Sequence, residues 1–162
     1  MSAQNIVVTT QDHERFQGTL ETIGRESNAR LVYLIDKAGQ QIACFGGIDG
    51  VDPTALASLT AGNVAATDGL ARLIGEKEFS ILFHEGERDN LHISVVGGRV
   101  ILVVVFDERS SLGLVRLRVK KASSELVEIF SDIDAKAAAE DNSFDSPFAE
   151  ITDDDIDSLF SS

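Results

Sequence analysis

The sequence is poor in several features that would each mark a class of protein. It has a single cysteine, Cys44, among 162 residues, which excludes an internal disulfide and a cysteine-based metal cluster. Its longest apolar run, residues 100–106, is far shorter than the roughly 20 residues that cross a bilayer. The first residues lack the basic and apolar regions of a secretory leader. We therefore expect a cytoplasmic protein without membrane insertion.

Positive charge is also scarce. The chain has 14 Lys and Arg against 27 Asp and Glu, a formal net charge of -13, which argues against nucleic acid or an anionic membrane surface as a partner. Much of this excess lies in residues 137–162, which contain no Lys or Arg. We expect a folded domain over residues 1–136 and an acidic flexible tail over residues 137–162, with residues 139–148 disordered.

Motifs for nucleotide hydrolysis and for metal binding are missing. The glycine-rich stretches GGIDG and VVGGR lack the Lys-Ser/Thr that completes a phosphate-binding loop, and no nucleophile elbow is present. The three histidines, His13, His84 and His92, do not have metal-ligand spacing. The sequence thus predicts no catalytic residue, no metal and no cofactor, and it argues against an enzyme.

The order of secondary structure indicates an α+β fold. Apolar spacing and turn residues predict a helix, a hairpin, a long helix, a three-stranded meander and a closing helix, at residues 11–28, 29–45, 52–77, 78–107 and 110–139. The first helix has Phe16, Leu20 and Ile23 on one face. The run at 100–106 is typical of a central strand covered on both faces. In the closing helix, the candidate core contacts are Leu114, Leu117, Leu126 and Phe130.

The long helix has an unusual distribution of side chains. Asp52-Pro53 supplies a helix start, and we expect the helix to end near Gly75 or Lys77. At about 100° per residue, the sector that we expect to pack on the sheet holds Leu56, Leu59, Asn63, Ala66, Thr67, Leu70 and Ile74. The other flank has only small residues at its middle, Ser58, Ala61 and Ala65, beside two glycines, Gly62 and Gly69.

Small residues on an exposed helix face have three explanations. Another part of the chain covers the face, or the fold tolerates small exposed residues there, or a second protein approaches the helix backbone closely. We favour the last explanation, in which Asp68, Arg72 and Glu76 set the register of the contact by their charge.

Two stretches of the chain, the first of which contains the small flank, resemble a known family. The block ASLTAGNVAATDGLARLIGEKEF, with FHEGERDNLHISVVGGRVILVVVFDERSSLGLVRLRVKKASSEL, is similar to the roadblock/dynein light chain family, and within it to the bacterial mutual gliding protein B group. The resemblance covers residues 10 to 135 and extends to SPFAEITDDDIDSLF. It implies an α-β-β-α-β-β-β-α sandwich, whose five-stranded antiparallel sheet has the long helix on one face and the terminal helices on the other.

The resemblance also implies a function. Members of the group are homodimers with a continuous sheet and paired long helices, and they activate a Ras-like small GTPase, in its GTP-bound form, in cell polarity and gliding motility. The resemblance thus implies a regulator rather than an enzyme, with other polarity proteins as further candidate partners and a cell pole as a candidate position. Carried over onto matching positions, the GTPase and dimer interface includes Ala61, Ala65, Asp68, Gly69 and Arg72. A non-catalytic dimeric adaptor and a nucleotide-exchange scaffold remain alternatives, because function depends on the surface rather than on the fold.

Activation of a GTPase raises the question of a catalytic arginine. An arginine supplied in trans contributes about 10³ to 10⁵ in rate, and the candidates by position are Arg72, Arg88, Arg99 and Arg109. None lies in a motif that marks an arginine finger. The resemblance implies instead that the regulator remodels the switch loops, so that the residues of the GTPase itself reach their catalytic positions.

The acidic tail contains a short amphipathic motif at residues 151–160. After Thr152, a candidate helix cap, Ile156, Leu159 and Phe160 are spaced i, i+3 and i+4. Three apolar side chains cannot hold so short a helix alone in water, but a groove on a partner can. The target is the GTPase, another polarity protein or the dimer itself, and the alternative is a tail that only adds solubility.

Overall fold

The computed structural model describes residues 8–149, and the side chains of residues 8–140. The chain divides into two compact units, residues 1–129 and 130–162. The predicted order of helices and strands is confirmed: α1 (Thr10–Glu26), β1 (Leu31–Asp36), β2 (Gln41–Gly46), α2 (Pro53–Leu73), β3 (Ile81–Glu85), β4 (Asn90–Val96), β5 (Val100–Phe106) and α3 (Leu112–Ala149).

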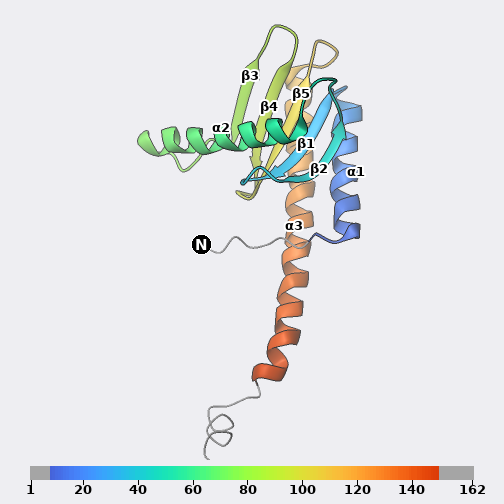
Figure 1. Cartoon of the computed structure of the whole chain (residues 1–162), viewed down its shortest axis with the longest axis vertical. Coiled ribbons are helices and arrows are strands. Elements are labelled where there is room, and N and C mark those ends of the chain that lie inside the picture. The colour runs from blue at the N-terminus through green and yellow to red at the C-terminus, as the bar shows by residue number, and fades with distance from the viewer. Residues whose placement is uncertain (1–7, 150–162) are drawn as a thin grey trace, which may run out of the picture. The chain divides into compact units, whose positions relative to one another are not determined.

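The five strands form one antiparallel sheet in the order β2-β1-β5-β4-β3 (Figure 1). The predicted central strand is β5, and all seven of its residues are buried. An apolar residue at every position is what a strand needs when both faces of the sheet are covered. The class is therefore α+β, as expected.

The helices cover opposite faces of the sheet. In Figure 1, α2 crosses one face, and α1 and the first half of α3 lie behind the other. The buried apolar residues of α1 include Phe16, Leu20 and Ile23, as predicted. The first unit thus has two apolar layers, one on each side of the strands.

In the closing helix α3, most but not all of the predicted core contacts are confirmed. Ser111 is its cap, because the Ser111 hydroxyl accepts a hydrogen bond of 3.2 Å from the Leu114 backbone N–H. Leu126 and Phe130 are buried, and Leu114 is half-buried. The prediction for Leu117 is wrong, since this side chain is 61% exposed. Val115 and Val119, which are buried, occupy the sheet-facing positions of these turns instead.

Helix α1 lies close against strand β2, at one edge of the sheet. A Cβ atom on Gly24 would come within 2.3 Å of the Phe45 ring, so glycine is required for this approach. The Gln17 side-chain amide donates a hydrogen bond of 2.8 Å to the Cys44 backbone carbonyl. A carbonyl of this edge strand is therefore already engaged by the chain's own helix.

The second unit begins at residue 130, and its described residues, 130–149, continue α3. We expected residues 139–148 to be disordered, and this is wrong for the backbone, which is helical to Ala149. A helix that has already begun needs no new nucleation, and Ala135 and residues 137–139, all alanines, have the highest helix propensity. The boundary at residue 136 stays a prediction.

Candidate interaction surface

The long helix α2 begins where the sequence predicts. Asp52 is its N-cap and accepts a hydrogen bond of 3.1 Å from the Thr54 backbone N–H, and Pro53 is the first helical residue. The helix ends at Leu73, earlier than expected. Gly75 follows with φ of +85°, a left-handed conformation that terminates a helix.

The face of α2 that packs on the sheet consists of small side chains, but of the small flank predicted from the sequence it includes only Ala61. The buried residues of the helix are Ala57, Thr60, Ala61, Val64 and Ala71. Three of them, Ala57, Ala61 and Val64, belong to a core cluster with Tyr33, Ile35, Ile93, Ile101 and Val103 of the sheet. Because those sheet residues are large, a helix with small side chains packs on them without leaving voids. Of the sector expected to pack on the sheet, Leu56 does pack against this cluster, but the prediction is wrong for Leu59, Leu70 and Ile74, which are exposed.

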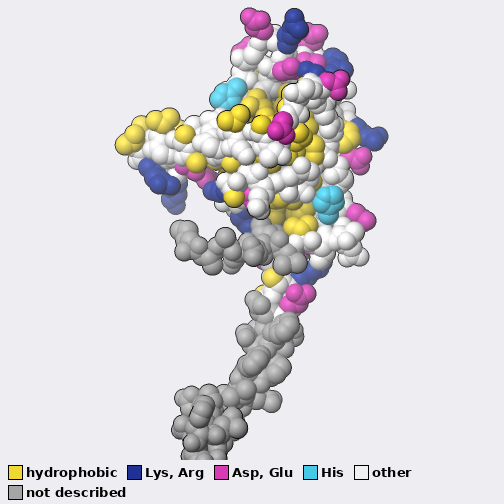
Figure 2. Space-filling model, viewed as in Figure 1, with side chains coloured by type: hydrophobic (Ala, Val, Ile, Leu, Met, Phe, Trp, Pro, Cys, Tyr) yellow, Lys and Arg dark blue, Asp and Glu magenta, His cyan; other side chains and the backbone are white. Residues whose placement is uncertain are grey.

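The large apolar residues of α2 point away from the core. The exposed fractions are 75% for Leu59, 57% for Leu70, 83% for Leu73 and 69% for Ile74. Figure 2 shows apolar side chains gathered on the end of α2 that projects from the sheet. The sequence pattern predicted Leu59, Leu70 and Ile74 in the core and no role for Leu73. The available signal was that α2 is apolar on two sides, which is unusual for a helix with one exposed face.

The five predicted interface residues divide between the core and this exposed side. Ala61 is 8% exposed and lies in the core cluster, so its side chain packs on the sheet and is not accessible to a partner. Ala65, Gly69 and Arg72 are exposed, and Asp68 is half-buried. A Cβ atom on Gly69 would meet nothing within 4 Å. A partner can therefore approach the backbone at Ala65 and Gly69, beside the exposed leucines.

Strand β3 forms the second edge of the sheet, next to α2. Asn63 of α2 and His84 of β3 form a hydrogen bond of 2.9 Å between Nδ2 and Nε2. On the inner side β3 pairs with β4, with Ile81 opposite Ser94 and the Val95 N–H donating to the Ser80 carbonyl. By the alternation of antiparallel pairing, the backbone groups of Ile81 point outward. The Ile81 side chain is 49% exposed.

We call this combined area the α2/β3 surface and define it by its exposed members: Leu59, Ala65, Gly69, Leu70, Arg72, Leu73, Ile74 and Ile81. It joins a row of large apolar side chains to an unpaired strand edge. Contiguous apolar exposure of this kind marks interaction sites, and an open edge is a template for another strand.

The other candidate residues of the sequence either lie elsewhere in the fold or fall outside the described part of the chain. The tail residues Ile156, Leu159 and Phe160 lie outside the described part of the chain. His84 and His92 occupy neighbouring strands but opposite faces of the sheet, because His92 pairs with Phe83. Cys44 is half-buried in β2, and burial raises the pKa of its thiol. Within residues 8–149, no group of three or more metal-ligating side chains could hold a metal, and no helix is long and apolar enough to cross a membrane.

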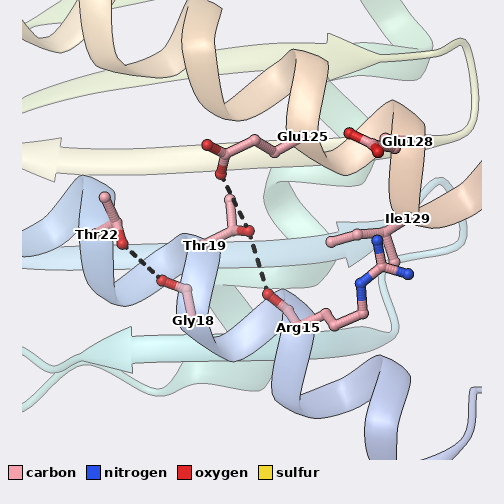
Figure 3. A pocket seen from close by; sticks show the side chains of 7 residues that line it. All are labelled: Arg15, Gly18, Thr19, Thr22, Glu125, Glu128 and Ile129. Atoms are coloured by element: carbon pink, nitrogen blue, oxygen red, sulfur yellow. Dashed lines mark hydrogen bonds between the residues drawn. The ribbon is translucent and has the colours of Figure 1, made fainter.

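A shallow groove of about 450 Å³ lies between α1 and α3, on the other side of the sheet (Figure 3). Its hydroxyl groups are engaged within the protein. Thr19 donates to the Arg15 carbonyl at 3.1 Å and lies 3.5 Å from a Glu125 carboxylate oxygen, and Thr22 donates to the Gly18 carbonyl at 3.0 Å. With these donors already used, the groove offers less for recognition than the α2/β3 surface.

Comparison with known proteins identifies the family. The Roadblock/LC7 domain model matches residues 16–106, which span α1 to the end of β5. The chain belongs to the Roadblock/LC7 domain family.

Three solved structures of MglB proteins are similar to this chain. MglB of Myxococcus xanthus is 51% identical, with a TM-score of 0.74, covering 78% of this chain and 96% of that one. The gliding protein MglB from Thermus thermophilus is 37% identical, with a TM-score of 0.73 and coverage of 81% and 99%. An MglB described as having a tetrameric arrangement is 36% identical, with a TM-score of 0.74 and coverage of 82% and 99%. No curated protein matches the chain.

Proposed function

We propose that this protein is a homodimeric GTPase-activating protein for a bacterial Ras-like small GTPase in gliding motility and cell polarity. Its similarity to gliding proteins supports the process. The observation that carries the proposal is the exposure of Leu59, Leu70 and Leu73 on a helix that also offers small residues for close contact. Leucines exposed to this degree are costly in water unless a partner covers them.

Dimer formation is proposed through the β3 edge and the adjoining helix. Two β3 edges in antiparallel pairing would join two sheets into one, with the outward backbone groups of Ile81 hydrogen-bonded. The α2 helices of the two copies would then lie close together and bury part of their exposed apolar residues. The rest of the paired helices forms the platform for the GTPase.

The proposed mechanism is remodelling of the switch loops of the GTPase. A regulator that binds one conformation of these loops better than another shifts their population by the ratio of the two affinities. The candidate arginines differ in their availability for a direct role. The Arg109 Nε lies 3.1 Å from an Asp107 carboxylate oxygen, whereas Arg72 is exposed at the last turn of α2. We assign Arg72 to binding rather than to phosphoryl transfer.

The test is single-turnover GTP hydrolysis by a purified Ras-like GTPase from the organism that makes this chain. We expect Ala65→Arg to reduce the acceleration at least tenfold, because a long charged side chain obstructs the close approach at α2. Ala65 is exposed, so the fold tolerates the change. Ala55→Arg, the same substitution at an exposed residue of the first turn, is the matched control. An unchanged acceleration with Ala65→Arg would contradict the proposal.

The same experiment separates the alternative function. An adaptor of this fold binds the GTPase through the same surface without changing hydrolysis. The half-buried Asp68 and the exposed Arg72 fit such a contact equally well, because charge complementarity gives specificity without chemistry. Binding that Ala65→Arg disrupts, with no acceleration by the unsubstituted protein, would identify the adaptor.

A further inference from the structure

The first turns of α3 are positively charged, although the protein as a whole is acidic. Between Glu108 and Glu125 the chain has no Asp or Glu, while the whole chain carries a net charge of -13. Six consecutive residues of this stretch, 116–121, include four cations: Arg116, Arg118, Lys120 and Lys121. These residues all belong to the first unit and lie on the face of the sheet opposite α2.

One of the four cations is used by the fold. Arg118 is half-buried, and its Nη1 lies 3.2 Å from a carboxylate oxygen of Glu26 on α1. Arg116, Lys120 and Lys121 are exposed, and their side chains make no hydrogen bond or ion pair with the described part of the chain. Three like charges so close together repel one another, and within the described residues no anion compensates them by direct contact.

An exposed leucine lies among these free cations. Leu117 is 61% exposed, and Lys120 and Lys121 follow it by three and four residues, so the three share one helix face. Gly113, one turn earlier, is also exposed, and a Cβ atom there would meet nothing within 4 Å. We call Arg116, Leu117, Lys120 and Lys121 the α3 basic strip.

The chemistry of the strip specifies its ligand. Three ammonium or guanidinium groups around one leucine match carboxylates that flank apolar side chains. The strip is bounded by Glu125 and Glu128 on the same helix, which repel a long polyanion such as nucleic acid. It spans only about 8 Å of helix, from residue 116 to residue 121 at 1.5 Å per residue. A short acidic segment fits such a patch.

We propose that the α3 basic strip binds residues 150–160 of a second copy of this chain. This segment, EITDDDIDSLF, carries Glu150, residues 153–155 (all Asp) and Asp157, together with the apolar side chains of Ile156, Leu159 and Phe160. It lies outside the described residues, and its composition complements the strip in charge and in apolar content. The strip and the α2/β3 surface lie on opposite faces, so the inference does not depend on the proposed function.

The first experiment measures binding of a fluorescein-labelled synthetic peptide of residues 148–162 by anisotropy at 50 mM NaCl. The receptor is the full chain with Asp153→Asn, Asp154→Asn and Asp155→Asn, which weakens competition by its own tail. We expect Lys120→Glu/Lys121→Glu in the receptor to weaken binding at least tenfold. Arg25→Glu/Arg88→Glu makes the same change in net charge elsewhere and is expected to alter binding less than twofold. Equal binding by the two variants, or no binding at all, would overturn the proposal.

The pairing itself is tested by charge exchange. A peptide with Asp153→Lys, Asp154→Lys and Asp155→Lys should bind the Lys120→Glu/Lys121→Glu receptor and not the original one. A peptide with Ile156→Ser, Leu159→Ser and Phe160→Ser should bind at least fivefold more weakly, because Leu117 loses its contacts. Binding that is indifferent to these apolar residues would indicate unspecific attraction of an anion and would contradict the assignment.

The last arm asks whether whole copies associate in this way. Sedimentation velocity of the unsubstituted full chain should give a larger average sedimentation coefficient at 50 mM than at 500 mM NaCl, since salt screens exposed charges. The Lys120→Glu/Lys121→Glu chain should lose this salt dependence. Peptide binding without salt-dependent association of whole chains would overturn the choice of a second copy as the source of the segment.

Discussion

At the scale of single residues, His92 has the most unusual environment in the described part of the chain. It is 0% exposed, and neither of its ring nitrogens has a hydrogen-bond partner among the described residues. Its neighbours across the strands, Phe83 and Val104, cannot carry charge, and Arg116 on α3 is positive. Burial lowers the pKa of His92, and Arg116 lowers it further. His92 is therefore neutral in the folded protein at neutral pH.

This environment predicts a stability that falls in mild acid. Because the pKa of His92 is lower in the folded than in the unfolded chain, the unfolded chain binds more protons below pH 6.5, and stability is lost as the pH falls. From pH 6.5 to 5 this contributes at most about 2 kcal/mol, since each unit gives up to about 1.4 kcal/mol. Urea unfolding at several pH values should show that His92→Leu lacks this loss, whereas His13→Leu, at an exposed histidine, retains it. Parallel profiles for all three proteins would contradict the assignment to His92.

At the scale of elements, the sequence predicted which helices and strands exist, and their order, far better than it predicted which side of α2 faces the sheet. Helix caps and the periodicity of a single apolar face depend on neighbouring residues alone. The start of α2 at Asp52-Pro53 and the buried face of α1 with Phe16 could therefore be predicted from the sequence. Which side of α2 faces the sheet could not be predicted, because the helix has apolar residues on two sides. The choice between them depends on the sheet, where Tyr33 and Ile101 leave room only for small partners such as Ala61. Of the predicted interface residues, Ala65, Gly69 and Arg72 are accessible to a partner, and their part in an interface stays a prediction.

The cap of α2 gives a prediction at this scale. Asp52→Ala removes the acceptor for the Thr54 N–H and should lower the free energy of unfolding by about 1 kcal/mol. Urea unfolding followed by circular dichroism measures the change. Asp49→Ala alters the same charge at an exposed residue before the helix and should have little effect. A similar loss in both variants would point to general electrostatics rather than to the cap.

At the scale of the whole molecule, the proposed dimer makes a prediction about the backbone of one residue. Ile81→Pro removes an N–H that points away from β4, so the sheet within each copy keeps its hydrogen bonds. Sedimentation equilibrium should show a dimer dissociation constant raised at least tenfold. Ile81→Ala keeps the N–H and should raise it less. If Ile81→Pro sediments as a dimer of unchanged affinity, the β3 edge is not the interface.

The two edges of the sheet differ in what they offer to an added strand. At β2 the Gln17 amide already occupies the Cys44 carbonyl, and α1 lies against Phe45. At β3 the backbone groups of Ile81 are open. At β2, therefore, one outward carbonyl and the neighbouring space are already taken by the chain's own helix, whereas β3 has no such cover at Ile81. Copies that pair only through β3, as in the proposed dimer, would stop at two chains and would not grow into a fibre.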